Sequence, residues 1–98
     1  MSQPETVPRH PVRLVAARTG LTPHALRAWE RRHHVVEPAR TEGGQRLYSD
    51  LDIARLRLLH RLTELGHGIG RIAPLPLAEL ERMTREETLK AFTLDAAH

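Results

Sequence analysis

Residues 22–32, TPHALRAWERR, are the stretch around which the rest of the chain is organised. Thr22 is a favourable N-cap, because its hydroxyl can accept a hydrogen bond from a free backbone N–H at a helix start. Pro23 suits the first helical position. No helix breaker follows before Arg32, so the sequence predicts a helix over residues 23–32.

The two sides of this predicted helix differ. Leu26 and Trp29 are three residues apart and share an apolar edge. A second face, which is rich in hydrogen-bond donors and has no acid, carries His24, Arg27, Ala28 and Arg31. Such a helix could enter the major groove of DNA, and the alternative for this helix taken alone is a solvated basic face.

A shorter helix is predicted just before it. Val12 and Val15 begin an apolar repeat at helical spacing in residues 12–18, and Gly20 suits a left-handed helix end. Only residues 19–22 separate the two helices. Two short helices joined by such a turn indicate a helix-turn-helix, although other helical hairpins use similar turns.

A β-hairpin is predicted over residues 39–48, ARTEGGQRLY. The glycine pair at 43–44 tolerates the positive φ angles of a tight turn. Arg40, Gln45 and Arg46 lie near its tip. A ribbon of this kind can rest on the DNA backbone or reach into a minor groove, whereas an isolated hairpin carries no functional signal.

The second half of the chain is predicted to be helical. Ser49 and Asp52 fit a capping box that opens a leucine-rich helix reaching about residue 65, with Gly66 closing it. Three further segments are expected: a short helical turn over residues 69–73, a helix starting at Pro76, and a final helix opened by a second capping box at Thr84 and Glu87.

Composition indicates one small domain with an electropositive first half. The 98 residues carry a net charge of +3, with 40% hydrophobic residues and only three aromatics. Residues 9–49 contain eight Arg against three acids, while residues 51–98 contain seven bases and seven acids. A polyanion would therefore dock on the first half.

Several classes of protein are disfavoured. The chain has no cysteine, which removes disulfides and thiolate metal sites and fits a cytoplasmic protein. No apolar run approaches the ~20 residues that cross a membrane, and no signal peptide begins the chain. The histidines, including His33, His34, His60 and His67, lack a convergent metal-ligand spacing. No catalytic arrangement is present, so we expect neither an enzyme nor a metal site.

The order of these elements resembles the winged-helix module of the MerR family of bacterial transcription regulators. The matching segments are VAARTGLTPHALRAWERR, EPARTEGGQRLYS and DLDIARLRLLHRLTELGHGIGRIA, which lie within residues 12–73. LRAWERR and IGRIAPL look most like the subgroup whose DNA-binding module precedes a cobalamin-binding, light-sensing domain. Two departures are His33-His34, where relatives usually carry Tyr-Gly, and Gln45, where a His is frequent.

The resemblance implies a mainly α fold of the winged helix-turn-helix type, with a small two-stranded β-hairpin as the wing. Residues 1–11 would be a flexible lead, residues 12–75 the DNA-binding domain, and residues 76–98 a helical extension or linker toward a missing effector domain. Either the chain is an excised module, which we favour, or it is a minimal regulator. No cofactor is expected in this chain, and cobalamin would bind in the missing domain.

The resemblance also implies partners and a function. The second helix would read the major groove of double-stranded DNA in a bacterial transcription regulator, a repressor if the subgroup holds. The full-length protein would be a homo-oligomer on repeated half-sites, with RNA polymerase or an antirepressor as further partners and no membrane. The alternative is a protein-interaction module whose basic face binds an acidic, antirepressor-like partner.

Ten residues are candidate DNA contacts: Arg13, Arg18, Thr22, His24, Arg27, Arg31, Arg40, Gln45, Arg46 and Tyr48. Arg27 and Arg31 would touch bases or phosphates, and the wing residues would touch the flanking backbone. Tyr48 would donate its hydroxyl to a phosphate or serve only in packing. Trp29 is expected to belong to the core. For each charged candidate the alternative is a solvated surface charge.

Overall fold

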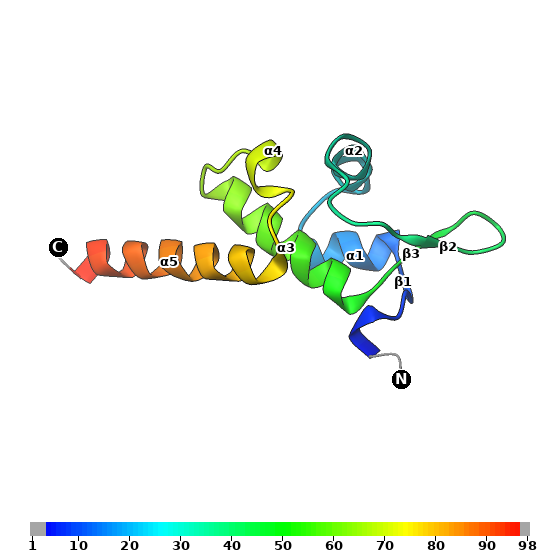
Figure 1. The fold of residues 1–98 in the computed structure, drawn as a ribbon, viewed down its shortest axis with the longest axis horizontal. Coiled ribbons are helices and arrows are strands. Elements are labelled where there is room, and N and C mark those ends of the chain that lie inside the picture. The colour runs from blue at the N-terminus through cyan, green and yellow to red at the C-terminus, as the bar shows by residue number, and fades with distance from the viewer. Residues whose placement is uncertain (1–3, 97–98) are drawn as a thin grey trace.

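The computed structural model describes residues 4–96 as a mostly helical protein with one small sheet. Its elements in chain order are a 3-10 helix (Pro4–Thr6), β1 (His10–Pro11), α1 (Val12–Thr19), α2 (Pro23–His33), β2 (Ala39–Arg40), β3 (Arg46–Tyr48), α3 (Asp50–Glu64), α4 (Ile69–Ile72) and α5 (Leu77–Ala96). The molecule is elongated, at 56 × 32 × 23 Å, with the β2–β3 hairpin extending from one end and α5 from the other (Figure 1).

The helix-turn-helix is confirmed. Helix α1 ends at Gly20, whose φ is 82° and whose N–H donates to the carbonyl of Ala16. Helix α2 begins after Thr22, whose side-chain oxygen accepts a hydrogen bond of 3.0 Å from the N–H of Ala25. The helix runs to His33, one residue beyond the predicted end, and is followed by His34 in the left-handed region. Local capping therefore determines both helix boundaries.

The sheet has three strands, in the order β1-β3-β2, and not the two that were predicted. His10 pairs with Tyr48 and Pro11 with Leu47, both antiparallel. Pro11 has no N–H to donate, and this suits β1 because it is an edge strand. Part of the expected flexible lead, residues 1–11, is therefore strand and 3-10 helix, while residues 1–3 lie outside the described residues.

Helix α3 is the centre of the core. Both halves of the predicted capping box at Ser49 are present, with Ser49 Oγ accepting from the backbone N–H of Asp52 and the Asp52 carboxylate accepting from the N–H of Ser49. Its buried stripe consists of Ile53, Leu56, Leu59 and Leu62. Residues from α1, α2, β3 and α5 pack around this stripe: Val15, Leu26, Tyr48 and Leu80. Helix α3 thus holds the helix-turn-helix and the sheet together.

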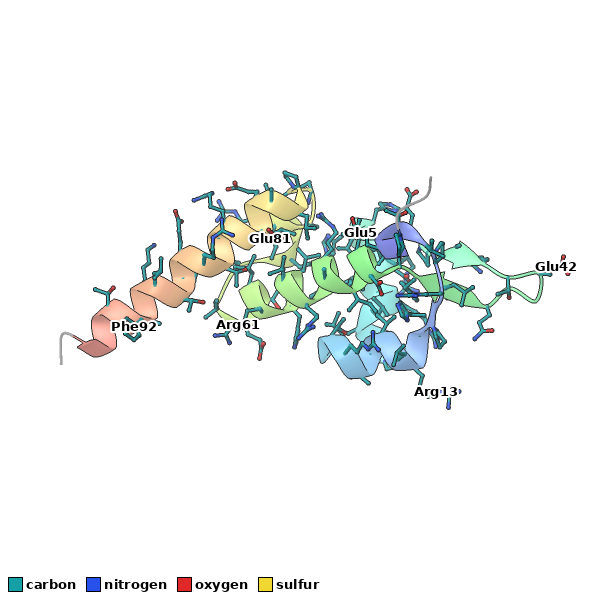
Figure 2. The ribbon with its side chains drawn as sticks, turned by 90° about the horizontal axis from the view of Figure 1, so that it is seen from below. Glu5, Arg13, Glu42, Arg61, Glu81 and Phe92 are labelled. Atoms are coloured by element: carbon teal, nitrogen blue, oxygen red, sulfur yellow. The ribbon has the colours of Figure 1, made fainter. Side chains whose placement is uncertain are left out.

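Helix α5 is continuous from Leu77 to Ala96, so the two separate helices expected here are wrong. Thr84 does not cap a new helix, because its hydroxyl donates to the carbonyl of Leu80 one turn earlier. Leu80 is fully buried against the core, whereas Leu89 and Phe92 are 64% and 73% exposed. Figure 2 shows Phe92 near the outer end of α5, far from Glu42 at the tip of the wing.

Candidate nucleic-acid interface

A cleft of about 440 Å³ lies between α2 and the wing, the segment from β2 to β3. Helix α2 contributes Arg27 and Arg31, and the wing contributes Arg40 and Arg46. The remaining lining residues are Glu30, Val36, Glu37 and Pro38. The cleft therefore gathers four arginines from two elements that are separate in sequence.

A second recess of about 280 Å³ adjoins the first through Arg27, which lines both. Arg13 from the start of α1 and Gln45 from the wing also line this recess. Figure 2 shows the Arg13 side chain pointing away from the body of the molecule. The two hollows bring six of the ten candidate residues onto one face: Arg13, Arg27, Arg31, Arg40, Gln45 and Arg46.

Three of the four arginines that line the larger cleft are not engaged elsewhere. Arg27, Arg31 and Arg40 are exposed, and they form no ion pair or side-chain hydrogen bond within the part of the chain that the structure describes. An unpaired guanidinium presents five N–H donors in a planar fork that matches phosphate and guanine edges. These side chains are therefore available to bind an anion.

The candidates at the start of α2 are placed differently. Thr22 and His24 are exposed at the N-terminus of the helix, where free N–H groups favour an anion. Thr22 already uses its oxygen as the cap of α2, although its hydroxyl remains able to donate. Arg18 is exposed in the last turn of α1 and lines neither hollow.

The predicted DNA contact of Tyr48 is wrong, because its side chain does not reach the surface. The residue is fully buried, and its hydroxyl donates to Glu30 Oε1 at 2.6 Å. Burial raises the pKa of the Tyr48 hydroxyl well above its usual range, and the hydrogen bond to Glu30 raises it further. Tyr48 is therefore a neutral core residue that cannot donate to a DNA phosphate.

Glu30 is a functional candidate that the sequence analysis missed. Only 8% of its side chain is exposed, and its Oε2 lies 3.4 Å from Arg46 Nε. Within the described residues this Oε2 is buried without a hydrogen-bond partner. The available signal was its spacing from Leu26, because residues four apart share a helix face and Leu26 faces the core.

A second polar cluster holds the sheet to α3. His10 Nε2 lies 2.5 Å from Asp50 Oδ1, and Arg9 Nη2 lies 2.8 Å from Asp50 Oδ2. The carboxylate can only accept, so the His10 nitrogen carries the proton in this contact. The hydrogen bond from His10, followed by that from Arg9, holds the pKa of Asp50 below its usual value. This cluster fixes β1, and through it β3 of the wing.

The structure also bears on Trp29, on metal binding and on membrane-spanning helices. Trp29 is half-buried and packs against the core, as predicted. Among the described residues, no group of three or more His, Cys, Asp or Glu side chains could hold a metal ion. Within the same part of the chain, none of the helices combines the length and the apolar character needed to span a membrane.

The helix-turn-helix, the wing and the arginine-lined face together define a winged helix-turn-helix protein of the DNA-binding type. A family model described as "MerR HTH family regulatory protein" matches residues 11–86. The chain therefore belongs to the MerR HTH family of regulatory proteins, whose members are DNA-binding transcription regulators.

Individual relatives agree with this assignment. The HTH-type transcriptional repressor CarH of Myxococcus xanthus is 36% identical over 85 residues, which are 87% of this chain and 28% of that protein. The HTH-type transcriptional regulator MlrA of Escherichia coli is 39% identical over 61 residues, which are 62% of this chain and 25% of that protein. The chain thus spans only about a quarter of these relatives.

A solved structure supports the fold. The crystal structure of a MerR-family transcriptional regulator from Bacillus cereus has a TM-score of 0.59 and 25% sequence identity, and the match covers 89% of this chain and 71% of that chain. The relatives are named as transcriptional regulators, and none of the names is that of an enzyme. The family resemblance and the mainly α, winged fold are confirmed, apart from the third strand.

Proposed function

We propose that this chain is the sequence-specific DNA-binding module of a bacterial transcription repressor. The observation that carries the proposal is the convergence of Arg27 and Arg31 from α2 with Arg40 and Arg46 from the wing on one cleft. Helix α2 would enter the major groove, and the wing would follow the adjacent backbone. Repression is favoured because CarH, 36% identical over 85 residues, is named a transcriptional repressor.

The proposed contacts have distinct tasks. Arg27 and Arg31 would read base edges, since a guanidinium can bind guanine through two hydrogen bonds. Arg13, Arg40 and Arg46 would neutralise phosphates, which contributes affinity without sequence preference. Thr22 and His24 would approach a phosphate at the N-terminus of α2.

Partners and effector belong to the same proposal. The full-length protein would act in the cytoplasm as a homo-oligomer on repeated half-sites, where it would compete with or contact RNA polymerase. Cobalamin binding by a further domain stays a prediction from the subgroup resemblance, and no residue of this chain is assigned to it. Docking of an acidic antirepressor on the arginine-lined face is the less favoured alternative, because the named relatives are regulators of transcription.

The test is selection of duplexes from a random-sequence pool, followed by fluorescence anisotropy with the enriched and scrambled sequences. We expect one motif to be enriched and bound at least about tenfold more tightly than its scrambled form, since specific sites exceed non-specific DNA by large factors. An acidic protein bound to the arginine-lined face, as in the alternative, should be displaced by the enriched duplex. Enrichment of no motif, with equal binding of all duplexes, would contradict the proposal.

A further inference from the structure

Glu30 is a buried carboxylate at the base of the arginine-lined cleft. An acid at this position would repel a phosphate, and burying a carboxylate is costly unless an opposite charge or a hydrogen bond compensates. Tyr48 compensates Oε1 with a hydrogen bond of 2.6 Å. The charge facing Oε2 is Arg46, whose Nε lies 3.4 Å away. Glu30 therefore contacts the wing through both oxygens, by a hydrogen bond at Oε1 and by an ion pair without a hydrogen bond at Oε2.

The geometry of β3 explains how one carboxylate holds the wing. Arg46 and Tyr48 begin and end β3, and residues two apart in a strand point to the same face. Both side chains therefore meet Glu30 of α2 from that face of β3. The backbone of Arg46 pairs with Arg40 in β2. Glu30 thus connects the reading helix to both wing strands.

Arg46 keeps free donors in this arrangement. Its side chain is 31% exposed and lines the cleft, and Nε is the atom that faces Glu30. Within the described part of the chain, its two Nη nitrogens form no hydrogen bond, and Nε is the atom nearest to Glu30. A guanidinium has five N–H donors, so these two nitrogens can bind an anion while Nε stays toward Glu30.

We propose that the cleft between α2 and the wing seats one DNA backbone phosphate, and that Glu30 is the positioning residue that holds the Arg46 guanidinium there. The cleft offers four arginines against Glu30 and Glu37, which leaves a local excess of positive charge for a phosphate. Glu30 itself does not touch the DNA. The inference rests on the proposed function, since the phosphate belongs to the bound duplex.

The opposite role is sequestration, in which Glu30 would hold Arg46 away from DNA. The two roles predict opposite signs for Glu30→Gln. The amide oxygen of Gln can still accept the hydrogen bond from Tyr48, so the substitution removes mainly the charge that faces Arg46. Under positioning, duplex binding weakens. Under sequestration, it becomes tighter.

The experiment is a double-mutant cycle with Glu30→Gln and Arg46→Ala in the whole chain. Kd for a selected duplex is measured by fluorescence anisotropy at several salt concentrations. We expect Glu30→Gln alone to weaken binding by roughly fivefold, within the range of coupling between contacting residues. In the Arg46→Ala background, Glu30→Gln should leave Kd unchanged or lower Kd. The Glu30 carboxylate has no partner charge there, so its replacement removes an unpaired negative charge beside the phosphate. The dependence of log Kd on log salt concentration should become less steep in both Glu30→Gln and Arg46→Ala.

Glu37→Gln is the matched control. Glu37 lines the same cleft but is exposed and has no ion pair among the described residues, so neutralising it should remove a repulsive charge and lower Kd, the opposite of the effect expected for Glu30→Gln. Tyr48→Phe is the second variant, since it removes the hydroxyl that holds Glu30 and should weaken binding only when Arg46 is present. Thermal unfolding of each variant identifies a temperature at which all of them are folded, and Kd is compared at that temperature.

The outcomes are separable. Tighter binding by Glu30→Gln, an unchanged Kd, or effects of Glu30→Gln and Arg46→Ala that simply add would each overturn the positioning role. Failure of the wild-type chain to prefer any duplex would instead overturn the proposed function. A loss of affinity in Glu30→Gln that disappears in the Arg46→Ala background supports the inference.

Discussion

At the residue scale, His34 makes the turn after α2 with a φ of 50°. A side chain in this left-handed region costs about 1 kcal/mol, and glycine avoids that cost at the expense of a more flexible unfolded chain. The histidine pair therefore places a strained residue directly behind the reading helix.

Replacing His34 by Gly should stabilise the fold. We expect His34→Gly to raise the free energy of unfolding by roughly 0.5 kcal/mol, which corresponds to a few degrees in Tm. The matched control is His33→Gly, which should destabilise because His33 is the last residue of α2 and glycine disfavours helix. Urea denaturation measures both changes. A loss of stability in His34→Gly would show that the imidazole itself makes a contact worth more than the backbone strain.

Asp50 gives the molecule an acid sensitivity. Its pKa is lowered in the folded protein by the hydrogen bond from His10 and by Arg9, so the ionised form stabilises the fold above the unfolded pKa. That stabilisation is lost as pH falls through the folded pKa, below about pH 4. We expect the stability difference between the wild type and Asp50→Asn to shrink between about pH 5 and pH 2.5. Chemical denaturation over this range measures it, and Glu42→Gln at the wing tip should show no such trend.

At the scale of single elements, the sequence predicted the helices whose ends are set by capping residues close in sequence. Thr22 and Ser49 are capping residues whose hydrogen bonds lie within a few positions, and both appear as expected. Strand β1 has only His10 and Pro11, and its partner β3 lies far along the chain, so no periodicity could reveal it. Thr84 fits a capping pattern, yet its hydroxyl donates to the carbonyl of Leu80 and α5 is continuous.

The candidate site was predictable in part for the same reason. Exposed residues such as Arg27 and Arg31 follow from helical spacing, which places both on one face. The orientation of Glu30 and Tyr48 depends on how α2 meets β3, which is tertiary packing. The sequence therefore indicated the surface of the interface but not the buried pair beneath it.

The reading role of α2 can be tested through Arg27. We expect Arg27→Ala to cost about 1–3 kcal/mol of binding to the selected duplex and to relax the preference at one base pair. Arg32→Ala is the matched control, because Arg32 is an exposed arginine of the same helix that lines neither hollow. Competition with single-base variants measures the preference. An unchanged ranking of these variants for Arg27→Ala would remove the residue from base recognition.

At the scale of the whole molecule, charge is concentrated at the end that carries the wing. Residues 9–49 hold eight of the arginines against three acids, and the two arginine-lined hollows lie on α1, α2 and the wing. Helix α5 extends the other way (Figure 1). On this helix Arg82 forms ion pairs with both Glu79 and Glu86, so its charge is already matched by acids. The molecule is therefore electrostatically polar along its length.

This asymmetry predicts a steep salt dependence. If roughly six phosphates are neutralised, log K should fall with log salt concentration at a slope of about −5. Anisotropy titrations between about 50 and 200 mM salt measure the slope. Lys90→Gln on α5 should leave it unchanged, since Lys90 is exposed on the helix remote from the cleft. A slope near zero would mean that the arginine face does not meet the backbone.

The short strand β1 also bears on how this domain should be isolated. A fragment cut at residue 12, where α1 begins, would discard the partner of Tyr48 and Leu47 and both side chains that hold Asp50. Arg9 also donates its backbone N–H to the carbonyl of Tyr48. Such a fragment would leave one side of β3 open to pairing with a neighbouring molecule, and aggregation at that edge would follow. The expression boundary belongs upstream of Arg9.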